Sequence, residues 1–70
     1  MIQPGDTVIF NKNFLHCLAG DTGTIKNVKV DTVSGRIFYR LTLDTAAGSV
    51  EIAYTRFCRT ITIKGQEVIT

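Results

Sequence analysis

Turn-forming residues recur at short intervals along this 70-residue chain, and their spacing limits the fold more than any other feature. They occupy residues 4–6, 19–23, 34–35, 46–48 and 64–65. The stretches between them suit short strands joined by turns. Val, Ile and Thr make up 24 of the 70 residues, whereas Leu and Ala contribute four each. Because β-branched residues favour strands over helices, we predict an all-β protein.

Alternation of apolar and polar residues places five strands, at residues 7–10, 24–30, 36–43, 49–54 and 60–63. A hairpin through 64–65 can return as a sixth strand at 67–69. The alternation is clearest at 36–43, which predicts one face bearing Ile37, Tyr39, Leu41 and Leu43 and an opposite face bearing Arg36, Phe38, Arg40 and Thr42. Residues 11–18 lack this pattern and form a long loop. Residues 55–59 suit a single 3₁₀ turn before the fifth strand, with Phe57 closing one end of a barrel.

The first 30 residues carry a resemblance to a known motif. The segment Pro4-Gly5-Asp6-Thr7-Val8-Ile9-Phe10, followed by Gly20-Asp21-Thr22-Gly23-Thr24-Ile25 and then Val28, is similar to the KOW motif of SH3-like barrels. Gly5 and Asp6 turn the chain into the first strand, and Gly20 and Gly23 can take positive φ before the second. The resemblance implies a single SH3-like barrel domain over residues 1–70, with five or six short antiparallel strands. It also implies contacts with RNA or with transcription and translation machinery.

A shorter segment resembles a second family of SH3-like proteins. Gly48-Ser49-Val50-Glu51-Ile52 looks like the Gly-Ser-Val-Gln-Ile-Tyr strand of the plasmid-borne, trimethoprim-insensitive dihydrofolate reductases, which work as tetramers. Glu51 stands where that family has Gln, and Ala53 stands where it has Tyr. Only Ile52 of the family's active-site residues carries over, so we do not expect reductase activity.

Charge, hydropathy and cysteine content indicate where in the cell the protein is expected. The formal net charge is +2, and no stretch approaches the about 18 apolar residues that a membrane span needs. The first residues lack the pattern of a secretory signal, so we expect a cytoplasmic protein with no membrane partner. Cys17 and Cys58 are then free thiols. A domain this small buries only about 60% of its unfolded surface, which makes a homo-oligomer one route to stability.

The predicted outer face of residues 36–43 is our first candidate binding surface. Phe38 between Arg36 and Arg40 suits stacking of an unpaired base with phosphate contacts on either side, and Tyr54 offers a second ring. Arg56 and Arg59 flank the turn after the fourth strand. These residues predict binding of RNA or single-stranded DNA. The alternative is that Phe38 lies under the long loop or in a dimer contact, with the arginines solvated.

The loop at 11–18 is the second candidate surface. It carries Phe14, Leu15 and Leu18, which is more apolar area than a solvated loop requires. These side chains cover either the barrel's own open end or a protein partner, which can be an identical subunit. In the second case the chain is an accessory or inhibitor protein, of the kind that phages and mobile elements encode.

Residues that could carry chemistry are sparse. His16 adjoins Cys17, but neighbouring residues of an extended segment point to opposite sides and seldom face one substrate. Structural zinc needs four ligands at closer pair spacing. The aspartates lie in turns, and residues 20–23 lack the Lys and the helix of a phosphate-binding loop. We therefore predict no catalytic residues, no metal and no cofactor, and a binding module rather than an enzyme.

Overall fold

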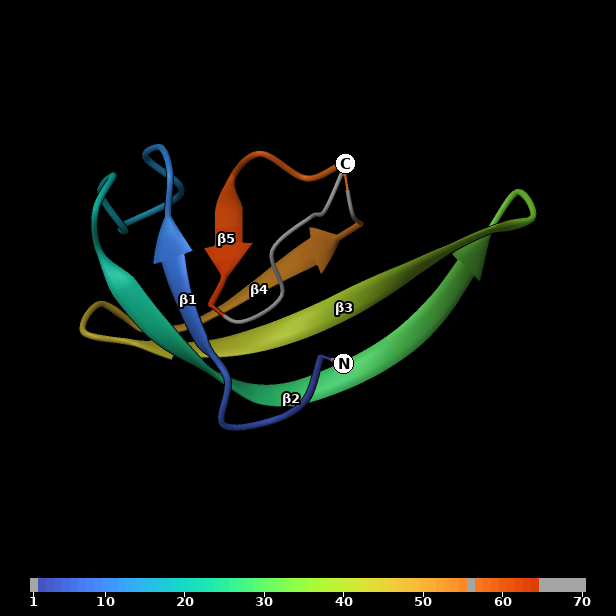
Figure 1. Cartoon of the computed structure of the whole chain (residues 1–70), viewed down its shortest axis with the longest axis horizontal. Helices are drawn as coiled ribbons and strands as arrows, with labels where there is room; N and C mark the ends of the chain where they lie inside the picture. Colours follow the sequence, from blue (N-terminus) through green and yellow to red (C-terminus); the bar gives the residue numbers. More distant parts are fainter. Residues whose placement is uncertain (1, 56, 65–70) are drawn as a thin grey trace.

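The chain forms one sheet of five antiparallel strands and no helix in the residues that the structure, a computed structural model, describes, namely 2–55 and 57–64 (Figure 1). The strands are β1 (Thr7–Phe10), β2 (Thr22–Val33), β3 (Arg36–Thr45), β4 (Gly48–Tyr54) and β5 (Ile61–Ile63). They lie in the order β4-β3-β2-β1-β5. The predicted all-β class is confirmed. Within the described part of the chain, no helix is long and apolar enough to cross a membrane.

The sheet does not close into the barrel that the sequence predicted. β4 and β5 stand at its two edges and are not paired with each other among the described residues. β5 has three residues and pairs with β1 alone among the described strands. The predicted sixth strand at 67–69 lies outside the described residues.

The core is made by alternate residues of all five strands, as period-two alternation requires. Leu41 and Leu43 of β3 are fully buried at its centre, and β2 adds Ile25. The other buried side chains are Val8, Phe10, Cys17, Val50, Ile52, Tyr54, Ile61 and Ile63. We call the sheet face that carries these residues the inner face. Only part of it is covered by the chain itself.

A bulge in β2 keeps the inner face apolar beyond Ile25. Ile25 pairs with Leu43 but the next pair is Asn27 with Thr42, so Lys26 has no partner of its own on β3. The extra residue shifts the alternation and returns Val28 to the inner face, where it packs against the core.

The β2–β3 hairpin is longer than predicted. Its turn consists only of Ser34 and Gly35, at φ 53° and 78°. Positive φ at both central residues is the two-residue turn whose twist matches that of the flanking strands. Pairing therefore continues to Val33 and Arg36. The strand predicted at 24–30 therefore ended three residues too early.

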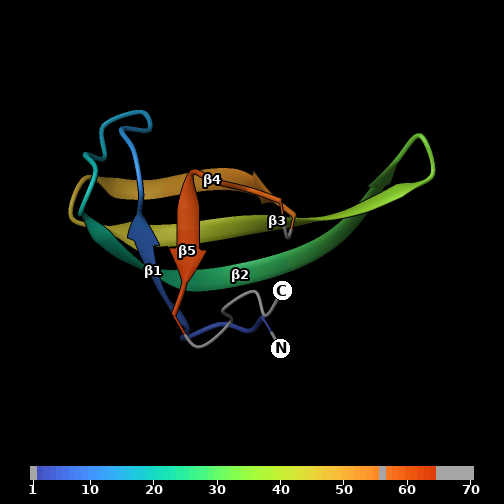
Figure 2. The same ribbon diagram turned by 45° about the horizontal axis from the view of Figure 1, so that its top comes forward.

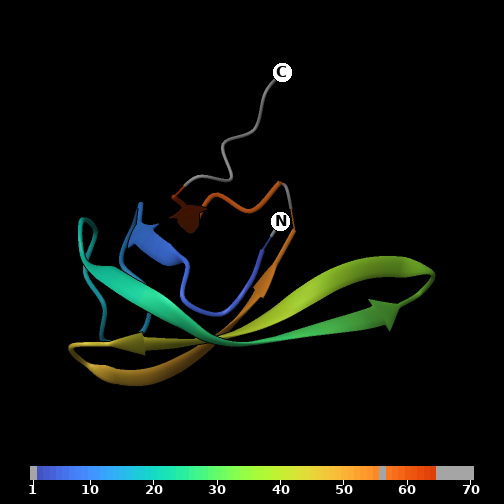
Figure 3. The same ribbon diagram turned by 60° about the horizontal axis from the view of Figure 1, so that its bottom comes forward.

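The end of this hairpin projects beyond the rest of the molecule (Figures 2 and 3). β1 pairs with β2 only at Thr22–Thr24, and the last pair between β3 and β4 joins Tyr39 to Tyr54. Residues 28–33 and 36–40 thus extend the sheet as a hairpin that is strictly two-stranded only at 31–33 and 36–38. Tyr39 and Arg40 still pair with β4, and Val28 and Tyr39 pack against the core. We call residues 28–33 and 36–40 the ribbon.

Two sequence expectations about individual residues are wrong. Phe57 does not close a barrel end, because 75% of its surface is exposed. After β4, the Cys58 N–H donates to the Thr55 carbonyl at 2.9 Å. Gly23 does not have positive φ; it is glycine because a Cβ there would lie 3.0 Å from Thr45 Cγ2 and 3.2 Å from a backbone oxygen.

Candidate nucleic-acid interface

The outer face of the ribbon brings together the three residues that the sequence placed on one face of the third strand. Phe38 pairs with Asp31 across the hairpin, Arg40 pairs with Lys29, and Arg36 pairs with Val33. Phe38 is half-buried, whereas Arg36 and Arg40 are exposed. The predicted alternation along β3 is therefore confirmed.

Arg40 is held in a fixed position on this face. Its Nη1 donates to Glu51 Oε1 at 3.1 Å, and its Nη2 donates to Asp31 Oδ2 at 3.2 Å. The hydrogen bonds to Glu51 and Asp31 raise the pKa of the guanidinium. Its central carbon lies 5.9 Å from the centre of the Phe38 ring, within the range of a cation–π contact. The Arg40 guanidinium therefore lies near the Phe38 ring, with each of its two terminal nitrogens hydrogen-bonded to a carboxylate.

The remaining cations of the hairpin are available to a ligand. Lys26, Lys29 and Arg36 are exposed, and every ion pair among the described residues involves Arg40. Residues 26–40 hold four Lys and Arg against one Asp, a net +3, so the other residues of the +2 chain sum to −1. Positive charge is thus concentrated on one projecting hairpin.

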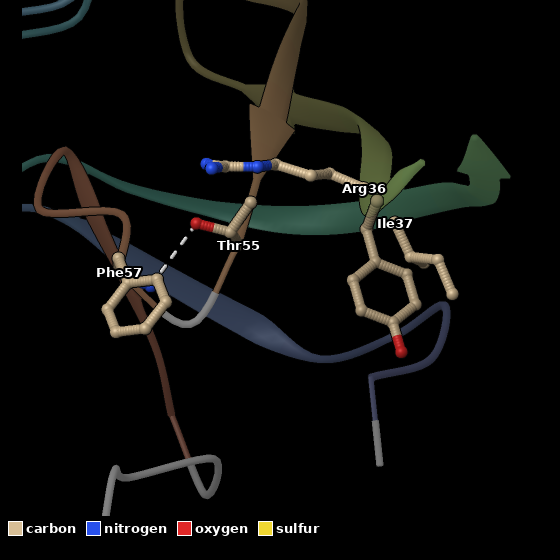
Figure 4. Close-up of a pocket in the computed structure, with 5 residues that line it drawn as sticks. Arg36, Ile37, Thr55 and Phe57 are labelled. Carbon is tan, nitrogen blue, oxygen red and sulfur yellow. Dashed lines mark hydrogen bonds between the residues drawn. The ribbon is translucent and has the colours of Figure 1, made fainter. Parts of the chain in front are cut away.

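An open hollow lies beside the ribbon, next to the residues that follow β4, and Arg36 of the outer face reaches it as well as Ile37 and Tyr39 of the inner face (Figure 4). It has a volume of about 830 Å³ and is lined by Arg36, Ile37, Tyr39, Thr55 and Phe57. The Phe57 N–H donates to Thr55 Oγ1 at 3.2 Å. Sequence reasoning missed this site because it assigned Ile37 to the core and Phe57 to a barrel end. Alternation shows which way a side chain points but not whether anything covers it.

The other residues predicted to bind nucleic acid do not join this surface. Tyr54 is 7% exposed and belongs to the core, so its ring is not available for stacking. Burial raises the pKa of the Tyr54 phenol, and Cys58 adds to the shift. Arg59 is exposed and its carbonyl accepts a hydrogen bond from Asn11 Nδ2 at 3.2 Å. Arg56 lies outside the described residues.

The loop at 11–18 divides its apolar side chains between the core and the surface. Phe14 packs on the core, with its ring 6.3 Å from that of Phe10, and Cys17 is buried. Phe14 and Cys17 exchange two backbone hydrogen bonds of 2.9 Å around a tight turn. Leu15, at φ 53°, and Leu18 are 70% and 60% exposed. Part of the loop therefore covers the chain's own core, and two leucines remain on the surface.

The remaining polar groups form no recognisable reactive centre in the part of the chain that is described. His16 is exposed while Cys17 points inward. Cys17 and Cys58 are both free thiols. No three of the described His, Cys, Asp and Glu residues are grouped so as to hold a metal ion.

Comparison with known proteins adds no relative. Neither a family model, nor a curated protein, nor a solved structure matches the chain. The case for a function therefore rests on the surfaces described above.

Proposed function

We propose that this protein is a small non-enzymatic binding module that holds RNA or single-stranded DNA on the outer face of its ribbon. The concentration of positive charge on this hairpin is the observation that carries the proposal. A net +3 over residues 26–40, in a chain whose other residues sum to −1, provides a localised attraction for phosphate groups. The likeness of residues 4–28 to the KOW motif supports the same class of ligand.

The arrangement around Arg40 suits unpaired bases. Bases released from a duplex stack on aromatic rings and on guanidinium planes. The guanidinium of Arg40 lies over Phe38 and is fixed by two carboxylates, so its free face is a preorganised platform for one base. Since both of its terminal nitrogens already bind carboxylates, Arg40 contributes a stacking surface, whereas Lys26, Lys29 and Arg36 supply the phosphate contacts.

Three phosphate contacts predict a definite salt dependence. For single strands the logarithm of the affinity falls with a slope of about −0.7 per contact, which gives about −2 here. Affinity for a labelled mixed-sequence single strand should then fall about 20-fold between about 50 and 200 mM salt. Fluorescence anisotropy measures both quantities on the full chain.

Matched variants separate charge from stacking. Lys29→Ala and Arg36→Ala should each reduce the slope by about 0.7, whereas Lys12→Ala, which removes the same charge from the loop at 11–18, should leave it unchanged. Arg40→Lys keeps the charge but loses the planar surface, so it should weaken binding without changing the slope. If neither Lys29→Ala nor Arg36→Ala changes the affinity for a single strand or its salt dependence, the proposal is overturned.

The exposed leucines of the loop favour a second candidate function, in which the chain binds a protein partner. Leu15 holds a φ of 53°, which is costly for a residue with a branched side chain, and the turn around it is fixed by backbone hydrogen bonds. If this candidate is correct, Leu15→Asn will abolish binding to the partner, and Lys29→Ala will not.

A further inference from the structure

The hollow beside the ribbon combines features that fit one class of ligand. Ile37, Tyr39 and Phe57 give it an apolar and largely aromatic lining, and Arg36 adds a guanidinium (Figure 4). None of the described residues that line it is acidic. Ligand sites are typically hollows of about 300–1,000 Å³ with apolar walls and a few polar groups, and this hollow of about 830 Å³ lies in that range. An aromatic ring that carries an anionic group therefore complements it.

The aromatic walls of the hollow are positioned by the fold itself. Tyr39 is half-buried, packs against the core and pairs with Tyr54 of β4. Phe57 is held through its backbone, because its N–H donates to Thr55 Oγ1 at 3.2 Å. The side chain of Phe57 is nevertheless 75% exposed. A ligand therefore meets an accessible aromatic surface whose position is already set, which lowers the entropic cost of binding.

Arg36 connects the hollow with the outer face of the ribbon. It lies on the same face of β3 as Phe38 and Arg40, yet its side chain also lines the hollow. It forms no ion pair with the described residues. We propose that the hollow holds one unpaired base of the bound strand against the rings of Tyr39 and Phe57, with an adjoining phosphate on Arg36. This inference rests on the proposed function and adds a second base site to the one over Arg40.

The lining of the hollow favours a nucleotide over other occupants. A purely apolar occupant would desolvate the Arg36 guanidinium without giving it a partner, which is costly. Inorganic phosphate would use Arg36 but not the aromatic walls. A base with its phosphate uses both, because bases stack on aromatic side chains and guanidinium groups pair with phosphate oxygens. The hydroxyl groups of Tyr39 and Thr55 also line the hollow and can donate or accept hydrogen bonds at a base edge.

Two labelled single strands of equal length test the base site. One has a mixed sequence, and the other consists of stable abasic sugar phosphates, so that it keeps the charge and lacks the bases. Fluorescence anisotropy measures the affinity of the full chain for each strand. Phe57→Ala should weaken binding of the mixed-sequence strand at least about fivefold, the lower end of what the loss of one stacked base costs. It should leave binding of the abasic strand and the salt dependence of both unchanged, because Phe57 carries no charge.

Two further variants serve as matched controls. Phe57→Tyr keeps the aromatic ring and should bind both strands as the unmodified chain does. Leu15→Ala removes an apolar side chain that is 70% exposed, about as much as Phe57, from the loop at 11–18, and it should change neither affinity. A second readout is independent of affinity: in the complex with the mixed-sequence strand, intermolecular NOEs should join base protons to the rings of Tyr39 and Phe57.

The same measurements separate failure of this inference from failure of the proposed function. If Lys29→Ala weakens binding of the mixed-sequence strand and Phe57→Ala does not, the strand bypasses the hollow. This inference is then wrong while the proposed function holds. Equal losses for both strands in Phe57→Ala would also overturn it, since they would show a disturbed fold rather than a lost stacking contact. If neither strand binds at low salt, the proposed function fails and this inference fails with it.

Discussion

Shortening an isoleucine by one methylene should have very different effects at two positions of the same sheet face. Ile25 and Ile37 both point to the inner face, but Ile25 is 1% exposed and Ile37 is 68% exposed. A buried Ile→Val change costs about 1 kcal/mol, with a usual range of about 0.5 to 1.5. Because Ile37 has lost only about a third of its surface to burial, Ile37→Val should cost about 0.3 kcal/mol.

Thermal and urea denaturation distinguish these values. For a domain of this length, 1 kcal/mol corresponds to about 4–8 °C in Tm, so Ile25→Val should lower Tm by that amount and Ile37→Val by about 1–3 °C. Far-UV circular dichroism and tyrosine fluorescence suit a chain with two Tyr and no Trp. The measurements are made at a few micromolar protein and repeated after tenfold dilution. An unchanged Tm then excludes a contribution from association. Equal losses at both positions in the monomer would refute the claim that the ribbon extends beyond the core.

Three further outcomes follow from the structure. Gly23→Ala should destabilise the fold by about 1–3 kcal/mol, because its Cβ would meet Thr45 Cγ2 at 3.0 Å; urea denaturation measures the loss, and a neutral result would contradict the close approach. Leu15→Asn should raise stability by up to about 1 kcal/mol in the same assay, since Asn tolerates positive φ better than Leu; a loss would show that Leu15 is not strained. Above about pH 10 the unfolded chain loses tyrosine protons that folded Tyr54 keeps, so the free energy of unfolding should fall until the pH passes the raised native pKa. Tyr54→Phe should make the free energy of unfolding fall less steeply with pH in this range. An unchanged pH dependence would contradict the raised pKa of Tyr54.

Local chemistry made much of the fold predictable. Alternation of apolar and polar residues located all five strands. It gave the ends of β1 exactly and assigned the side chains of β3 to the correct faces, because successive residues of any strand point to opposite sides. The ends of β2 were missed because they depend on pairing: Thr22 pairs with Ile9 of β1, and the compact Ser34-Gly35 turn lets the hairpin with β3 continue to Val33. Barrel closure was wrongly predicted for a similar reason: it requires β4 and β5 to meet, and no short segment specifies that contact.

The candidate surface was predictable only in part. The side-by-side placement of Arg36, Phe38 and Arg40 follows from the sequence of β3 alone. The carboxylates that fix Arg40 come from two other strands, at Asp31 and Glu51, so their role depends on register. The exposure of Ile37 and Phe57 depends on where neighbouring strands end, which has no local signature.

An NMR titration of the isotope-labelled chain with a short mixed-sequence single strand tests the central claim most directly. We expect the largest amide shift changes at Lys29, Arg36, Phe38 and Arg40, on the outer face of the ribbon, and a loss of these changes in Lys29→Ala with Arg36→Ala. The loop residues Leu15 and Leu18 serve as an internal reference and should not shift. Changes confined to that loop, or none at low salt, where electrostatic attraction is strongest, would contradict nucleic-acid binding by the ribbon.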